Sequence, residues 1–189
     1  AAGYFLGTPG AFQKENQLII KSMKQQMGNM VLIGMPGTGK SLIGKCLAEL
    51  TGKTLQDTDA KIEEEAKMTI PEIFEKEGEA GFRDRESAIC KKLGKERNLI
   101  IATGGGAILR PENVDALRQN GTLVHITRSI DKLPTRGRPL SKNIETLKKM
   151  EAQRMPLYKA AADITFRNNY TCSRKKLRQR VNTYILEKL

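Results

Sequence analysis

The chain has 189 residues, enough for one compact domain with a short appendage, and Lys and Arg outnumber Asp and Glu by 33 to 21, a formal net charge of +12. Hydrophobic residues make up 39% of the chain, as in a globular protein with a core, and no apolar stretch approaches the ~18 residues that a membrane span needs. The 3 cysteines lie far apart and there is 1 histidine, so a disulfide framework and a zinc ribbon are excluded and a reducing compartment is expected.

The first 28 residues are interpreted as an N-terminal extension. Residues 1–10 are rich in Gly and predict an irregular tail, whereas apolar residues near helical spacing predict a helix over 11–27. The segment has no apolar run of the kind found in secretory signals and contains no Arg, which argues against a targeting function. A docking helix, a remnant of a linker in a larger polypeptide and an oligomer contact are the interpretations that the pattern leaves open.

From residue 29 onward, short apolar runs alternate with longer periodic segments. Strands are expected at 30–33, 54–56, 99–103, 122–127 and 163–166. Helices are expected at 41–50, from the end of the D-T-D segment at 57–59 to about 67, and in a segment that has Pro71 in its first turn. Further helices are expected from the Gly78–Gly81 region to about 96, at 111–119, at 144–155 and from 173 to the end. Such alternation is typical of βαβ units. It predicts an α/β fold, with one three-layer α/β/α domain and a five-stranded parallel sheet over 29–189, and a loop at 133–142.

Two of the expected helices have an apolar stripe. The stripes predict that these residues face inward: Leu42, Ile43, Cys46, Leu47 and Leu50 in the first helix, and Leu177, Val181, Tyr184, Ile185 and Leu189 in the last. The last helix also has basic residues over 173–180, and the stripe favours a core-packed helix with a solvated basic face over a nucleic-acid-binding helix. The chain has no Trp and few other aromatic residues that could stack on bases. His125 is expected in a strand and not as a catalytic base.

The segment Gly34-Met-Pro-Gly-Thr-Gly-Lys-Ser41 matches the phosphate-binding pattern G-x-x-x-x-G-K-[ST] in full. It lies between an apolar strand and a helix, where the N–H groups of a glycine-rich loop and of the helix N-terminus bind a phosphate. Lys40 can reach the β- and γ-phosphate oxygens, and the Ser41 hydroxyl is placed to ligate Mg²⁺. The pattern predicts a nucleoside triphosphate site formed by Gly37, Thr38, Gly39, Lys40, Ser41 and Leu42.

Two carboxylates, Asp57 and Asp59, follow the second expected strand. Side chains two residues apart leave a strand on the same side, so both can face a cleft at the carboxyl edge of the sheet. One could hold Mg²⁺ or its water shell, and the other could accept a proton from an attacking hydroxyl. The alternative is that Asp57 or Thr58 caps the next helix. The phosphate loop at the same edge favours the functional interpretation.

A triple glycine, Gly104-Gly105-Gly106, follows the strand at 99–103. Without side chains, a ligand can approach the backbone and use its N–H groups, and a tight structural turn is the alternative. In the loop at 133–142, Arg136 and Arg138 lie two residues apart. Such a loop could close over a nucleotide and stabilise the charge of the transferring phosphoryl group.

Taken together, residues from about 29 to 189 resemble the shikimate kinase family, a member of the P-loop group similar to nucleoside-monophosphate kinases. The resemblance rests on GMPGTGKS, the D-T-D of 57–59, Gly81-Phe-Arg83, the triple glycine, Arg138-Pro-Leu140 and Arg154-Met-Pro-Leu-Tyr158, in this order. It implies ATP-dependent phosphorylation of the shikimate 3-hydroxyl, in the chorismate and aromatic amino-acid pathway. A gluconate kinase or another small-molecule kinase of this group, and a nucleotide-dependent RNA-binding module, are the alternatives.

The resemblance also implies a role for each site residue. Asp59 is the base or positions the hydroxyl, while Lys40 and Arg138 neutralise the γ-phosphate, and Arg138 belongs to the ATP site as well. Asp57 orients Mg²⁺, with Ser41 as its direct ligand. Shikimate is held by Asp59, Arg83, Gly104, Gly105, Gly106 and Arg154.

The expected partners are therefore ATP and shikimate, with Mg²⁺ as the cofactor and without nucleic acid or membrane. A cytoplasmic monomer is expected, whose N-terminal extension is available for a contact. In this interpretation, part of the net charge of +12 neutralises two anionic substrates, and the remainder lies on solvated helix faces.

Overall fold

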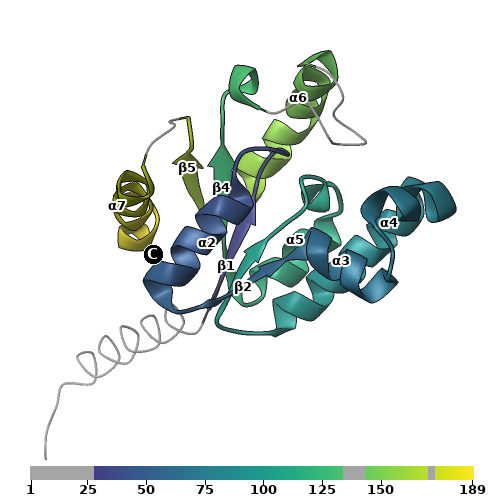
Figure 1. Ribbon diagram of the computed structural model, residues 1–189, viewed down its shortest axis with the longest axis horizontal. Helices are drawn as coiled ribbons and strands as arrows, with labels where there is room; N and C mark the ends of the chain where they lie inside the picture. Colours follow the sequence, from purple (N-terminus) through teal and green to yellow (C-terminus); the bar gives the residue numbers. More distant parts are fainter. Residues whose placement is uncertain (1–27, 134–143, 170–172) are drawn as a thin grey trace, which may run out of the picture.

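A five-stranded parallel sheet forms the centre of the computed structural model, which describes residues 28–133, 144–169 and 173–189 (Figure 1). The strand order is β2-β3-β1-β4-β5. The strands are β1 (Asn29–Ile33), β2 (Thr54–Asp57), β3 (Leu99–Ala102), β4 (Gly121–Thr127) and β5 (Ile164–Arg167). The predicted α/β fold with five parallel strands is confirmed, and each strand begins and ends within one residue of its expected bounds.

Helices cover both faces of the sheet and produce the three layers. One hydrophobic cluster joins the sheet to α2 (Lys40–Thr51) and α7 (Arg174–Tyr184). A second cluster joins the other face to α3 (Thr58–Ala66), α4 (Ile70–Lys95), α5 (Pro111–Arg118) and α6 (Ile144–Ala161). Short 3₁₀ helices occur at Ala107–Leu109, Ile130–Lys132 and Leu186–Lys188. Because successive side chains of a strand point to opposite faces, Met30 and Leu32 of β1 enter the first cluster, whereas Val31 and Ile33 enter the second.

The strand order gathers the predicted site residues at one edge of the sheet. β3 lies between β2 and β1, so the carboxyl ends of these three strands are neighbours. Asp57 pairs with Ala102, and Ala102 pairs with Leu32 on its other side. The phosphate loop, the D-T-D segment and the triple glycine therefore leave the sheet side by side, where ligands bind in open α/β folds.

Helix α4 has a sharp kink at Gly78, where φ is 68°. The helix begins with a capping box between Thr69 and Glu72, and Pro71 lies in its first turn, as expected. On either side of the kink, Glu77 accepts two hydrogen bonds from the Arg85 guanidinium, at 2.7 and 2.8 Å. The two helices predicted from the glycines are thus the two arms of one kinked helix.

Two expectations from the apolar patterns are wrong. Leu42 is 58% exposed because the inward face of α2 is formed by Ile43, Gly44, Cys46 and Leu47, and consecutive side chains diverge by about 100° around a helix. Tyr184 is 51% exposed at the end of α7.

Helix α6 was expected to end at Met155 but continues to Ala161. Pro156 removes one backbone hydrogen bond from the helix. The turn beyond it buries Tyr158 and Ala161 against the sheet, and this burial stabilises the continued helix.

The only histidine of the chain, His125, lies in β4 and is 2% exposed. Its ring stacks on Tyr158, with 4.9 Å between the ring centroids. Burial and the nearby ammonium groups of Lys40 and Lys159 lower the pKa of His125 to about 4. The imidazole is therefore neutral at physiological pH, which agrees with its expected place as a strand residue.

We expect His125→Phe to change how the stability of the protein depends on pH. The unfolded chain binds a proton at His125 below about pH 6.5, whereas the folded chain does so only near pH 4, so the wild type loses stability over this window as the pH falls. Because Phe does not titrate, the variant does not lose this part of its stability as the pH falls. Relative to the wild type, its free energy of unfolding in denaturant should rise by about 2 kcal/mol between pH 7.5 and pH 5. A constant difference between the two proteins would contradict the neutral imidazole.

Candidate active site

A cavity of about 540 Å³ opens at the carboxyl edge of the sheet. Helix α4 and the three neighbouring loops line it together with Arg154 of α6. The predicted site residues in its wall are Gly37, Gly39, Lys40, Ser41, Leu42, Asp57, Asp59, Arg83, Gly104, Gly105, Gly106 and Arg154. Thr38 is buried beneath the phosphate loop, where its hydroxyl donates to the Met35 carbonyl at 3.0 Å. Arg136 and Arg138 lie outside the described residues, as does most of the predicted lid.

The phosphate loop has the strained backbone that its glycines permit. Gly39 adopts a φ of 94° at the N-terminus of α2, in the left-handed region that favours glycine. A side chain there would also lie 2.6 Å from Nδ2 of Asn168. The Lys40 ammonium donates to the carbonyls of Gly34 and Met35 at 2.8 and 3.0 Å. The loop thus keeps its amides and its lysine at the end of the cavity where a phosphate would bind.

Ser41 and Asp57 form an oxygen-rich corner next to this loop. The Ser41 hydroxyl donates to Oδ2 of Asp57 at 2.8 Å, and Oδ1 of Asp57 accepts from the Asp59 backbone amide at 3.1 Å. Asp57 therefore caps α3 and faces the phosphate loop at once, so the two interpretations from the sequence are compatible. Mg²⁺ is typically held by one or two protein oxygens together with phosphates and water, and this donor pair fits that chemistry.

Asp59 is a half-buried residue of the cavity wall, and its carboxylate lies close to that of Glu86. A side chain at Gly104 would lie 2.7 Å from both Oδ1 of Asp59 and Oε1 of Glu86. Neither of these oxygens has a hydrogen-bond partner among residues 28–133, 144–169 and 173–189. Burial and the charges of Asp57 and Glu86 raise the pKa of Asp59 to about 6. A carboxylate of this kind can accept a proton from a hydroxyl near neutral pH.

Arg83 crosses the cavity wall from α4. Its guanidinium donates to Glu86 at 2.8 Å and to Glu79 at 3.0 Å, and it lies directly against Gly106, where any side chain would overlap it. Burial raises the pKa of Glu86, although Arg83 opposes this effect. Glu86, which is 0% exposed, was not among the predicted site residues. Its place three residues after Arg83 on a helix was the available signal.

Arg154 approaches the triple glycine from α6. Its Nη1 donates to the Gly105 carbonyl at 3.1 Å, and its Nε donates to no atom of the described residues. The Tyr158 hydroxyl donates to the same carbonyl at 2.5 Å. Arg83 and Arg154 thus enter the wall of one cavity from two helices, next to Asp59.

Asn168, directly after β5, was not among the residues predicted for the site. Its side-chain amide donates to the Thr38 carbonyl at 2.8 Å, and its backbone amide donates to the Thr127 carbonyl, also at 2.8 Å. Asn168 therefore connects the phosphate loop to the ends of β4 and β5. No motif in the sequence marks it, because a single Asn after a strand is usually part of a turn.

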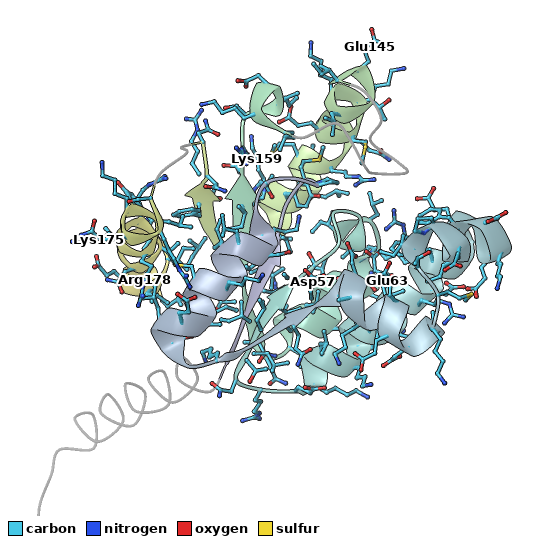
Figure 2. The ribbon with its side chains drawn as sticks, in the orientation of Figure 1. Asp57, Glu63, Glu145, Lys159, Lys175 and Arg178 are labelled. Carbon is cyan, nitrogen blue, oxygen red and sulfur yellow. The ribbon has the colours of Figure 1, made fainter. Side chains whose placement is uncertain are left out.

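The basic residues of α7 lie away from the cavity. In Figure 2, Lys175 and Arg178 are on α7 at the left of the view, apart from Asp57 near the centre and Glu63 to its right. Arg174 forms an ion pair with Glu49 of α2, and Arg178 approaches the same carboxylate at 3.9 Å. No helix in the described part of the chain is long and apolar enough to span a membrane.

Comparison with known proteins now identifies the family. The family model for shikimate kinase matches residues 36–189. The chain belongs to the shikimate kinase family. The shikimate kinase of Nitrosomonas europaea is 46% identical over 145 residues, which cover 72% of this chain and 69% of the relative. That of Chromobacterium violaceum is 39% identical over 151 residues, covering 76% and 82%.

A solved structure agrees with this assignment. Shikimate kinase from Acinetobacter baumannii in complex with shikimate is 34% identical, with a TM-score of 0.79 over 89% of this chain and 98% of that one. The expected family and the expected class of enzyme, a kinase that phosphorylates an alcohol with ATP, are confirmed.

Proposed function

We propose that this member of the shikimate kinase family transfers the γ-phosphoryl group of ATP to the 3-hydroxyl of shikimate, giving shikimate 3-phosphate and ADP on the route to chorismate and the aromatic amino acids. One observation carries the proposal: a single cavity presents the half-buried carboxylate of Asp59, whose Oδ1 has no partner among the described residues, together with Arg83 and Arg154. A polyol with one carboxylate needs cations at its acid and an acceptor at its reacting hydroxyl. Arginine suits the first task because its guanidinium matches a carboxylate.

Each side chain then has a place in the reaction. Asp59 accepts or orients the proton of the attacking hydroxyl, and Lys40 neutralises charge on the transferring phosphoryl group, with Arg138 of the lid. Ser41 and Asp57 would hold Mg²⁺, which would neutralise phosphate charge when bound. Because the transition state of phosphoryl transfer is loose, positioning and charge account for most of the barrier reduction. The pairing of Ser41 with Asp57 and the buried oxygen of Asp59 support this division.

The same proposal covers the organisation of the chain. Residues 29–189 form the kinase domain and 1–28 an extension that is available for a contact, and the enzyme works as a monomer in the cytoplasm. The described cysteines, Cys46 and Cys90, are free and buried, as in proteins of a reducing compartment. ATP and shikimate are the only partners that the proposal requires.

A coupled ADP-release assay tests the reaction. The purified chain is incubated with ATP and Mg²⁺ and with shikimate, quinate, gluconate or no acceptor, and the phosphorylated position is assigned by ³¹P and ¹H NMR. We expect turnover with shikimate and a kcat/KM for gluconate lower by several orders of magnitude. Turnover with gluconate but not with shikimate would replace this proposal by the sugar-acid kinase alternative.

The substrate clamp is tested separately with Arg154→Ala. A charged hydrogen bond to a carboxylate contributes about 1.5–3 kcal/mol, so the KM for shikimate should rise by about 10- to 100-fold. The KM for ATP should stay within about twofold. Arg97→Ala, an exposed arginine between α4 and β3, is the matched control and should behave as the wild type. An unchanged KM for shikimate would remove Arg154 from the clamp.

A further inference from the structure

The carbonyl of Gly105 is the point where α6 meets the triple glycine. It accepts hydrogen bonds from the Tyr158 hydroxyl at 2.5 Å and from Nη1 of Arg154 at 3.1 Å. On the other side of Gly105, the ring of Pro36 from the phosphate loop packs so closely that a side chain would lie 2.6 Å from its Cδ. The position of this one peptide group therefore depends on residues from three segments of the chain.

Tyr158 does not line the cavity itself. It is 1% exposed, its ring stacks on His125, and burial raises the pKa of its hydroxyl well above the usual range, so the hydroxyl is a permanent donor. A carbonyl oxygen has two lone pairs, so it accepts from the neutral phenol and from the charged guanidinium at the same time. Arg154 uses Nη1 for this carbonyl, and its Nε has no hydrogen-bond partner among the described residues.

The peptide bond carries the same constraint to the next residue. In a trans peptide, the Gly105 carbonyl and the Gly106 N–H point in opposite directions, and no described peptide bond is cis. When the carbonyl is held toward α6, the orientation of the whole peptide group between Gly105 and Gly106 is fixed. The Arg83 guanidinium lies directly against Gly106. A rotation of this plane would disturb Arg83 as well as Arg154. Through this peptide group, the Tyr158 hydroxyl thus affects the positions of both Arg83 and Arg154.

We propose that Tyr158 is a positioning residue for the carboxylate clamp: by binding the Gly105 carbonyl it holds in place the peptide group to which Arg154 also donates and against which Arg83 rests. The inference rests on the proposed function, because it assumes an acceptor whose carboxylate lies between these two arginines. It differs from a packing role in one respect. A residue that only packs the core affects all ligands of the site equally, whereas Tyr158 affects the carboxylate end alone.

The test compares Tyr158→Phe with the wild type, using shikimate and its methyl ester as probes in calorimetric titrations. The variant keeps the stacked ring and removes only the hydroxyl. The loss of one buried hydrogen bond corresponds to about a 3- to 10-fold change in an equilibrium constant, so the Kd for shikimate should rise by this factor. The Kd for the ester, which has no carboxylate charge, and the Kd for MgADP should each stay within about twofold. In turnover, the KM for shikimate should rise while kcat changes little.

Tyr184→Phe is the matched control, because it removes the hydroxyl of an exposed tyrosine on α7 and should leave every constant unchanged. Equal weakening of shikimate and ester binding, or no weakening of either, would overturn the inference whatever happens to the melting temperature. If Tyr158→Phe fails to fold, Tyr158→Met provides the same comparison with a flexible apolar side chain. A wild type that neither binds nor phosphorylates shikimate would instead refute the proposed function, and this result is known before any variant is measured.

Discussion

Replacing Asp59 by Asn should lower kcat by about 10²- to 10⁴-fold, the range over which general-base catalysis acts. The amide has the shape of the carboxylate but cannot take the proton of the attacking hydroxyl. The nucleotide end of the cavity is built from the phosphate loop, Ser41 and Asp57, so the Kd for MgATP should stay within about threefold. Single-turnover kinetics with saturating shikimate measure the chemical step, and fluorescence titration measures nucleotide binding.

The pH dependence of the wild type provides a second measurement of the same group. The pKa of Asp59 is about 6 because of burial and the charges of Asp57 and Glu86, so its basic form is lost as the pH falls through this value. We expect kcat to decline below about pH 6 in the wild type and the small residual rate of Asp59→Asn to lack this decline. Glu64→Gln, an exposed carboxylate on the same helix, is the control. A variant with near-normal kcat would exclude Asp59 as the base.

Replacing Lys40 by Met should lower kcat/KM for ATP by about 10²- to 10³-fold, as for the loss of one preorganised donor to transition-state charge. Met keeps the apolar stem of the side chain and removes the ammonium. That ammonium donates to Gly34 and Met35 in the structure, so it also holds the phosphate loop. The loss should therefore appear in nucleotide binding as well as in kcat.

Lys45→Met is the control for this variant, because Lys45 is an exposed lysine on the same helix, α2. Steady-state kinetics with varied ATP and equilibrium binding of MgADP separate the two effects of the ammonium. The KM for shikimate should change little in either variant. A Lys40→Met enzyme with wild-type kcat/KM for ATP would contradict the proposed contact with the transferring phosphoryl group.

The sequence predicted those parts of the site that rest on spacing and on backbone chemistry. The phosphate loop follows from eight consecutive residues, and the place of Asp57 and Asp59 follows from the two-residue period of a strand. Strands β1, β3 and β4 were predicted to within a residue because each is a short, largely apolar run that ends at glycine or at polar residues. These features depend on local order alone.

The residues that were missed act through contacts between distant segments. Glu86 looks like one more charge on a long polar helix until the fold buries it against Arg83. Tyr158 and Asn168 touch loops that lie 53 and 130 residues away in the chain, and no local pattern records such contacts. The early end predicted for α6 has a similar cause, since propensity at Pro156 is overridden by tertiary packing of the turn that follows.

The space above two of the site's glycines has a consequence for how this enzyme can diverge. The space that a side chain would fill at Gly104 is occupied by the carboxylates of Asp59 and Glu86. At Gly106 it is occupied by the guanidinium of Arg83. A larger residue at either position would be accommodated only if one of these partners became smaller. Compensating pairs of mutations, the usual route by which packed positions drift, would here remove the proposed base or one arm of the clamp. We therefore expect that no substitution at Gly104 or Gly106 can be compensated by a change in its contacting side chain without loss of activity.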